Sequence, residues 1–344
     1  MGRIALGLGV LACGQREVFA QPAEHAAYAA IETSSGTGTS RARFFSEAGG
    51  ALGVTPLDFR AHGMACHDRH LVVFPRRPGT RFAVVDHRSL EILRVVEAPP
   101  ERHFFGHGAF TRDGGHLLVT ENNLDTLSGS IGVYETGSGF RRLGQIELPG
   151  PGPHEIVRDP TRDLFFVALG GLETHPAYGR TPLNLSGFRS QVLKLGFDRG
   201  SIDPLGFWPG TEGISLRHLD IDAHGALYVG GQLVDPRQGA GERVLWRVNA
   251  GHAEDLTAGA LFGGYVSSVA SHGPETLVTS KEAHRAAKLI DGEITEVYAI
   301  EGASAAALGP GLASISGFDA LSLNHKDVPV SHGFEFDNHG LAII

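Results

Sequence analysis

Histidine is the residue type in this sequence most able to do chemistry, and several of its 18 copies recur at one place in a repeated pattern. Each of His62, His107, His154 and His218 opens a short apolar stretch that runs into a turn and a second apolar stretch. Successive members are 45, 47 and 64 residues apart, and Ser268 takes the same place 50 residues later. Imidazole is the commonest protein ligand for transition metals. The recurrence indicates a shared site if the fold brings the repeats together.

The repeated unit is clearest in residues 102–148. It reads as four short antiparallel strands, GHGAFT, HLLVTEN, SIGVYET and RRLGQIEL, and Asp113-Gly114 suits a hairpin turn. Such a sheet cannot bury both faces alone, so it must stack against copies of itself. The spacing of the units matches the period of about 40–50 residues found in propeller blades. The 64-residue gap holds an insertion, and a β-sandwich is the alternative fold.

The two ends of the chain are expected to complete one blade between them. The residues before the first full unit supply only part of a blade, and FEFDNHGLAII, at 334–344, reads as the missing strand. With a last unit at about 302–323, the count is seven blades in one domain, residues 21–344. Six blades is the alternative if the last unit is only a loop. We therefore predict an all-β, seven-bladed β-propeller closed by its C-terminal strand.

The first strand of a propeller blade lines the central channel, which predicts where the repeated histidines lie. We predict that His107, His154 and His218 face the channel and could hold iron, copper or zinc. In a regular strand, adjacent side chains point to opposite faces, so only one of His154 and Glu155 could face the axis. The alternative is that these histidines only cap turns. The remaining candidates for a channel ligand site are His62, Glu121, Asn122, Glu155 and His339.

Two polar segments lie outside the repeats. The insertion GGLETHPAYGR carries Glu173, His175, Tyr178 and Arg180, and long loops of this kind often cover a channel mouth. A decorated surface loop is the alternative. The pair Arg76-Arg77 is either an anion site or a solvated turn, and we favour the turn.

The N-terminus resembles a secretory signal. Residues 1–20 contain IALGLGVLA and a small-residue cleavage site, which predicts a mature periplasmic protein that starts at Gln21. Processing before Cys13 as a lipoprotein and an ordinary buried strand are the alternatives. Cleavage at Gln21 leaves Cys66 as the only cysteine, so no intrachain disulfide can form, and we expect Cys66 to be buried.

Composition narrows the classes of function. The formal net charge is −9, which disfavours nucleic acid as a partner. No apolar run reaches 18 residues, so no transmembrane span is predicted. The sequence lacks G-x-S-x-G, Walker and C-x-x-C motifs.

Many short motifs agree, in order, with a known family. They include GHG at 106–108, TEN at 120–122, GPHE at 152–155, GGLETHP at 170–176, RHL at 217–219 and DNH at 337–339. Over residues 25–344 the chain resembles the exported domain-of-unknown-function family 1513, YVTN/WD40-like seven-bladed propellers. Family members usually have a twin-arginine signal, where this chain has only Arg3, and a tryptophan, where it has Phe336.

The family is found near genes for imelysin-type iron-regulated proteins and di-haem oxidoreductases. The resemblance implies a periplasmic role close to iron or metal uptake, with iron-uptake proteins as partners.

Three functions follow from these observations. The first is a periplasmic binding or accessory protein in metal acquisition, with a metal or small ligand in the channel. The second is a lactonase or hydrolase that uses a channel metal or a His/Glu base, for which Glu121, Asn122, Glu155 and Asp220 could supply oxygen ligands. The third is a scaffold for protein partners.

Overall fold

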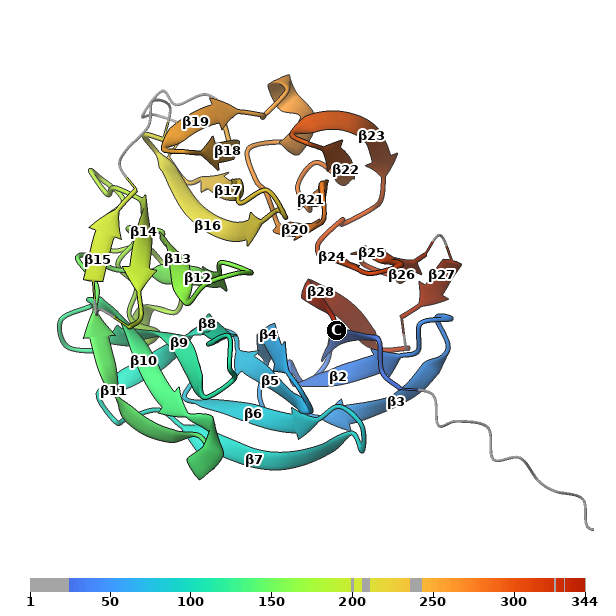
Figure 1. Cartoon of the computed structure of the whole chain (residues 1–344), viewed down its shortest axis with the longest axis horizontal. Coiled ribbons are helices and arrows are strands. Elements are labelled where there is room, and N and C mark those ends of the chain that lie inside the picture. The colour runs from blue at the N-terminus through green and yellow to red at the C-terminus, as the bar shows by residue number, and fades with distance from the viewer. Residues whose placement is uncertain are drawn as a thin grey trace, which may run out of the picture.

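Seven four-stranded antiparallel sheets surround a central axis in the computed structural model (Figure 1). This confirms the all-β, seven-bladed propeller and excludes the six-bladed and sandwich alternatives. The structure describes residues 25–198, 201–205, 211–235, 243–324, 326–330 and 332–343. The predicted signal peptide, with Cys13, lies outside the described residues. Within the described residues, no helix is long and apolar enough to cross a membrane.

The innermost strand of each blade belongs to a ring of contacts that runs around the axis. Among the described residues, the connections contain the short 3-10 helices η1 (Thr136–Ser138), η2 (Pro176–Tyr178) and η4 (Gly259–Phe262). From the axis outward, the blades are β28 (Phe334–Ala342), β1 (Tyr28–Ser34), β2 (Ser40–Phe45), β3 (Ala51–Pro56); β4 (Ala61–His67), β5 (His70–Pro75), β6 (Arg81–Asp86), β7 (Glu91–Glu97); β8 (Arg102–Phe110), β9 (His116–Asn123), β10 (Gly129–Glu135), β11 (Arg141–Glu147); β12 (Pro153–Arg158), β13 (Leu164–Leu169), β14 (Gln191–Gly196), β15 (Ser201–Pro204); β16 (Ile214–Ile221), β17 (Leu227–Leu233), β18 (Leu245–Asn249), β19 (His252–Asp255); β20 (Ser268–His272), β21 (Glu275–Ser280), β22 (Arg285–Ile290), β23 (Glu293–Ala299); and β24 (Ala306–Gly309), β25 (Leu312–Ser316), β26 (Ala320–Leu323), β27 (Lys326–Pro329).

The C-terminal strand β28 closes the ring. It pairs antiparallel with β1, beginning with Tyr28 opposite Ala342. This pairing gives the first blade its innermost strand and removes an exposed sheet edge. The predicted closure is therefore confirmed. The last blade lies later in the sequence than expected. Its strands run from Ala306 to Pro329, whereas the sequence predicted residues 302–323.

Apolar side chains fill the space between neighbouring blades. Phe82 of one blade packs against Phe104 and Tyr134 of the next, with ring centroids 5.1 and 5.4 Å apart. All three side chains are fully buried. The outer strands have a different character, and β7 is mostly exposed along its length. Apolar packing between the faces of neighbouring blades thus stabilises each blade. The innermost strand can therefore present polar side chains to the axis.

β-bulges interrupt the innermost strand of five blades. The pairing registers of β4, β8, β12, β16 and β28 with their neighbours all shift within the strand. The registers of β20 and β24 are continuous. A bulge leaves residues unpaired, twists the strand locally and redirects side chains. The five bulged strands are the ones that carry the repeated histidines and His339.

Candidate functional site

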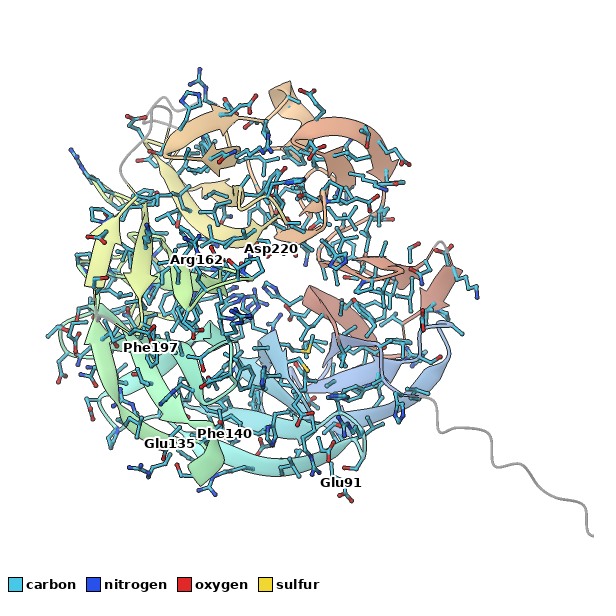
Figure 2. All side chains as sticks on the ribbon, in the orientation of Figure 1. Glu91, Glu135, Phe140, Arg162, Phe197 and Asp220 are labelled. Atoms are coloured by element: carbon cyan, nitrogen blue, oxygen red, sulfur yellow. The ribbon has the colours of Figure 1, made fainter. Side chains whose placement is uncertain are left out.

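Five histidines converge at the axis, one from each bulged strand. Their side chains are nearly buried, with residue exposures of 7% for His62, 4% for His107, 7% for His154, 1% for His218 and 9% for His339. Neighbouring ring centroids lie 4.5–5.1 Å apart for the pairs 62–339, 107–339, 62–107, 107–154 and 154–218. Figure 2 shows side-chain nitrogen atoms gathered near the axis. The structure therefore brings together the three histidines predicted to face the channel, and His62 and His339 join them.

Glycines make this close approach possible. A Cβ on Gly63 would lie 2.4 Å from the Gly106 carbonyl oxygen and 2.9 Å from Nδ1 of His107. Gly106 has a φ of +114°, which side chains rarely adopt, and a Cβ there would lie 2.7 Å from Cδ2 of His62. Each of these glycines precedes or follows a cluster histidine in the sequence. The missing side chains leave room for the rings of the neighbouring blade.

The ring nitrogens of three histidines are close enough to share one metal ion. Among the described residues, His62, His107 and His339 are the group whose potential ligand atoms all lie within 4.8 Å of one another. The sequence favoured His107, His154 and His218 as metal ligands, whereas the distances favour His62, His107 and His339. His107 and His218 are farther apart, with ring centroids separated by 6.4 Å. The candidate metal ligands thus come from β4, β8 and β28.

Glu155 orients two of the imidazoles. Its carboxylate lies 3.4 Å from Nδ1 of His107 and 3.2 Å from Nδ1 of His218, and it accepts a hydrogen bond from the backbone N–H of Leu219. The Nε2 atoms of both histidines are buried and have no hydrogen-bond partner in the part of the chain that the structure describes. A carboxylate on Nδ1 favours the tautomer that carries the proton there and leaves the Nε2 lone pair available to a ligand.

The bulge in β12 explains how Glu155 reaches the cluster. Pro153 pairs with Leu169, and the next paired residue is Ile156, so both His154 and Glu155 lie in the irregular part of the strand. The expectation that only one of these neighbours could face the axis assumed a regular strand, and it is wrong. His154 reaches the rings of His62 and His218 while Glu155 contacts the same cluster.

Burial favours the neutral form of His62, His154, His218 and His339. Burial lowers the pKa of His62 to about 3, and it lowers the pKa values of His154 and His339 well below their usual range, an effect to which neighbouring imidazoles add. Burial alone would raise the pKa of Glu155, but contacts with His107 and His218 outweigh it and hold that pKa well below its ordinary value. The cluster thus combines an ionised carboxylate with imidazoles, among them His62 and His339, whose neutral form is favoured, the form that binds a metal cation.

Two cavities meet the cluster from different directions. The first, of about 340 Å³, has Glu155, Asp220, His107 and His339 in its wall, and we call it the carboxylate-side cavity. Asp220, labelled in Figure 2, accepts hydrogen bonds from the backbone N–H groups of Ser271 and Ile221. Burial raises the pKa of Asp220 to about 7. A carboxyl group with such a pKa can both accept and donate a proton near neutral pH.

The second cavity, of about 450 Å³, has His62 and His154 in its wall together with several basic side chains, and we call it the arginine-side cavity. Arg76 and Arg77 belong to it and are partly buried. The favoured interpretation of this pair as a solvated turn is therefore wrong. Thus His107 and His339 line the carboxylate-side cavity, whereas His62 and His154 line the arginine-side cavity.

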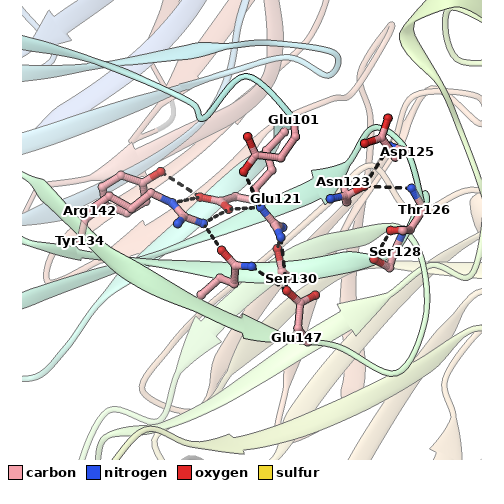
Figure 3. A network of polar contacts seen from close by, with 12 residues as sticks. Glu101, Glu121, Asn123, Asp125, Thr126, Ser128, Ser130, Tyr134, Arg142 and Glu147 are labelled. Carbon is pink, nitrogen blue, oxygen red and sulfur yellow. Dashed lines mark hydrogen bonds and ion pairs between the residues drawn. The ribbon is translucent and has the colours of Figure 1, made fainter.

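Glu121 and Asn122 do not line either cavity. Glu121 is fully buried on β9, where it accepts hydrogen bonds from the Tyr134 hydroxyl at 2.8 Å and from Arg142 at 2.7 Å (Figure 3). Asn122 donates to the Leu127 carbonyl and accepts from the Gly152 N–H. Their prediction as channel ligands is wrong because β9 is the second strand of its blade and both side chains bond within that blade or to its connecting loops. Both residues instead stabilise the blade.

Of the four residues singled out in the insertion, one lines a cavity. Arg180 is exposed and lines the arginine-side cavity. His175 caps η2 by accepting a hydrogen bond from the Ala177 N–H, and Tyr178 is 63% exposed. Glu173 is partly buried and holds the loop through a backbone N–H that donates to Asn184. These three residues do not line the two cavities, so the expectation of a covering loop holds only for Arg180.

Cys66 is only partly buried, although we expected full burial, and it lines the carboxylate-side cavity. Burial, followed by the charge of Asp68, raises the pKa of its thiol to about 12. It is therefore a protonated thiol rather than a thiolate ligand.

Sequence reasoning missed Asp337 and Arg217. Asp337 lies 3.6 Å from Nδ1 of His62. Arg217 is the extra residue of the bulge in β16, directly before His218. Both are charged residues next to a cluster histidine, and that adjacency was the available signal.

Comparison with known proteins places the chain in a family. The family described as a protein of unknown function, DUF1513, matches residues 55–343. The chain belongs to this family. No curated protein of known function matches the sequence.

Solved structures share the fold of this DUF1513 protein. Hydrazine synthase of Kuenenia stuttgartiensis is similar with a TM-score of 0.61 and 14% identity, over 88% of this chain and 95% of that one. The WD40 repeats of RRP9 align with a TM-score of 0.54 and 12% identity, over 84% and 87% of the two chains. A Bacteroides caccae protein of unknown function aligns with a TM-score of 0.53 and 9% identity, over 92% and 99%. At these identities the likeness concerns the fold alone.

Proposed function

We propose that this DUF1513 protein binds a divalent transition metal in its channel and acts as a periplasmic binding or accessory protein in metal acquisition. The observation that carries the proposal is the convergence of three buried imidazoles, from His62, His107 and His339, with potential ligand atoms within 4.8 Å of one another. The buried Nε2 atoms of His107 and His339 have no hydrogen-bond partner among the described residues. Buried polar atoms without partners are costly, and a bound cation would satisfy them.

The types of ligand atom restrict which metal ions could bind. Three neutral nitrogen donors suit iron, copper or zinc, whereas calcium and magnesium prefer oxygen ligands. Glu155 supports the site as the partner of the His107 Nδ1 atom, an arrangement that raises the basicity of a ligating imidazole. Three protein ligands leave at least one coordination position for a further ligand.

Metal analysis of untagged protein tests this proposal. Elemental analysis after purification should find a transition metal, and competition with a chromogenic chelator should give its affinity. His62→Ala and His339→Ala should weaken binding by about 100-fold or more, since removal of a ligand should exceed the 10- to 100-fold effect of an outer-shell change. His154→Ala and His218→Ala serve as matched controls from the same cluster and should have smaller effects. Absence of metal after reconstitution, or equal effects of all four substitutions, would contradict the assignment.

A hydrolase of the lactonase type is the second candidate. The specific observation is Asp220, whose pKa of about 7 suits a general base and whose side chain shares a cavity with His107 and His339. An open position on a metal is also typical of catalytic sites. A panel of lactones and esters separates the two functions. Asp220→Asn should abolish any metal-dependent hydrolysis and leave metal affinity intact, and an intact rate in this variant would exclude Asp220 as the base.

The periplasmic location is proposed from the sequence of the N-terminus. Cleavage at Gln21 would produce a mature chain that retains every candidate ligand. Mass spectrometry of protein from a Gram-negative host should find a first residue at or near Gln21. A chain that retains Met1 would contradict export, and a lipidated Cys13 would support the lipoprotein alternative.

A further inference from the structure

The arginine-side cavity concentrates positive charge at one mouth of the channel. Its wall includes five basic side chains that come from four different parts of the sequence. They are Arg76, Arg77, Arg180, Arg217 and Lys281. The chain as a whole carries a net charge of −9, so the positive charge of this cavity is opposite in sign to that of the whole chain. Like charges brought together in a partly buried space repel, and the arrangement needs a compensating anion.

Three of these arginines have no carboxylate partner. Within the described part of the chain, Arg77, Arg180 and Arg217 form no ion pair, whereas Arg76 reaches Asp337 at 3.8 Å. The Arg217 side chain forms a hydrogen bond with Tyr265, but its Nε atom is buried and has no hydrogen-bond partner among the described residues. Glu282, the acidic residue in the cavity wall, is exposed. The guanidinium groups of Arg77 and Arg180 are therefore available to a ligand, and the buried Nε–H of Arg217 is a further donor.

The surroundings hold these cations in place. The guanidinium of Arg77 lies over the ring of Phe105, 4.6 Å from its centroid, and that ring is 1% exposed. Burial, together with the charges of Arg217, Arg180 and Arg76, lowers the pKa of Arg77 to about 9. Arg217 lies in the bulge of β16, which fixes its backbone next to His218. A positioned and strained set of cations is a feature of a binding site rather than of a solvated surface.

We propose that the arginine-side cavity binds a small oxyanion with two or more negative charges, of the phosphate or polycarboxylate type. Guanidinium groups are planar forks that match the oxygen atoms of carboxylate and phosphate groups. A space of about 450 Å³ accommodates such a molecule. Because His62 and His154 share the wall, a bound anion would lie against the histidine cluster.

The location suggests a link between the two sites. His62 belongs both to the candidate metal ligands and to the wall of the arginine-side cavity. An oxygen atom of the anion can therefore occupy an open coordination position of the metal. This coupling rests on the proposed metal function, whereas the anion site itself depends only on the arginines.

Titration calorimetry on the metal-free full-length protein tests the anion site, with inorganic phosphate and citrate as separate probes. Saturable binding of either probe is expected, and the stronger probe identifies the class of anion. Arg77→Gln and Arg217→Gln should each weaken binding by about tenfold or more, because each removes charge-assisted hydrogen bonds. Arg88→Gln is the control, since Arg88 pairs with Asp68 on the exposed surface, and it should bind like the parent chain.

Arg180→Gln provides a variant on an exposed loop, so its effect does not depend on tolerance of a change inside the blades. It should also weaken anion binding, while metal affinity without anion stays unchanged. Failure of both anions to bind, or an equal loss in Arg88→Gln, would overturn the proposal. If the histidines bind no metal, anion binding to the metal-free protein should persist, so the two proposals fail separately.

Discussion

Replacement of Gly63 by alanine should disturb the histidine cluster from a position that is not itself a ligand. The new Cβ would lie 2.4 Å from the Gly106 carbonyl oxygen, whereas ordinary contacts begin near 3.4 Å, so the strands must separate by about 1 Å. The obstacle is backbone and cannot rotate away. We expect a loss of about 3 kcal/mol in the free energy of unfolding, the upper part of the range for overpacked interiors.

The same Cβ would lie 2.9 Å from Nδ1 of His107, so the ring must leave its present position relative to His62 and Glu155. Metal affinity should then fall by about 10- to 100-fold, as when the support of a ligand is lost. Urea unfolding and chelator competition measure the two effects.

Gly144→Ala is the matched control for this substitution. Gly144 lies on the outer strand β11, where a Cβ would meet no atom within 4 Å. Its stability should stay the same or rise by up to about 1 kcal/mol. If Gly63→Ala unfolds and binds metal like the parent chain, the close packing of β4 against β8 is refuted. If it loses stability but keeps its metal affinity, Gly63 does not position His107.

Three further predictions concern the scaffold. Glu121→Gln should reduce stability by about 3–5 kcal/mol in urea unfolding, because it leaves Arg142 without its buried partner, and a change below 1 kcal/mol would contradict this. Deletion of β28 should expose the edge of β1 and abolish cooperative unfolding; a truncated chain that melts like the parent would refute closure. Burial lowers the pKa of His103 to about 4, and the charges of Arg77 and His175 contribute. Below pH 6.5 the unfolded chain takes up a proton on His103 and the folded chain does not, so stability is lost as the pH falls from 6.5 toward 4. Between pH 7 and pH 5 the free energy of unfolding should fall by about 2 kcal/mol more in the parent chain than in His103→Asn. Equal pH dependence of the two proteins would refute this.

The fold was predictable because its determinants are local and repeated. Each unit carries its own turn, and Gly114 adopts the positive φ of 68° that the Asp113-Gly114 pair suggested. Identical units must pack in equivalent ways, so a period near 45 residues implies a ring. The limits of the last blade were less predictable, because few residues of its innermost strand repeat the pattern of the other units.

The site was predictable only in part, because the bulges have no reliable signature in the sequence. A regular strand places adjacent residues on opposite faces, and on that rule His154 and Glu155 cannot share a site. The structure departs from the rule at the strands that carry histidines. Glu121 was misassigned for a different reason. An acidic residue in a polar motif can be either a channel ligand or one member of a buried ion pair, and the sequence does not distinguish the two. Its partner Arg142 is 21 residues away, and only the pairing of strands reveals the contact.

The histidine cluster is one-sided, and this asymmetry bears on how it can work. The histidines come from five adjacent blades, whereas the remaining two innermost strands, β20 and β24, have regular registers and place Ser268 and Ala306 in the wall of the carboxylate-side cavity. A complete ring of seven imidazoles would enclose an ion and fill its coordination sphere. An arc of imidazoles that faces small side chains instead leaves free space beside the ion. The same strands that deviate from regular pairing therefore carry the candidate ligands, and the strands that remain regular would leave the space for an exchangeable ligand.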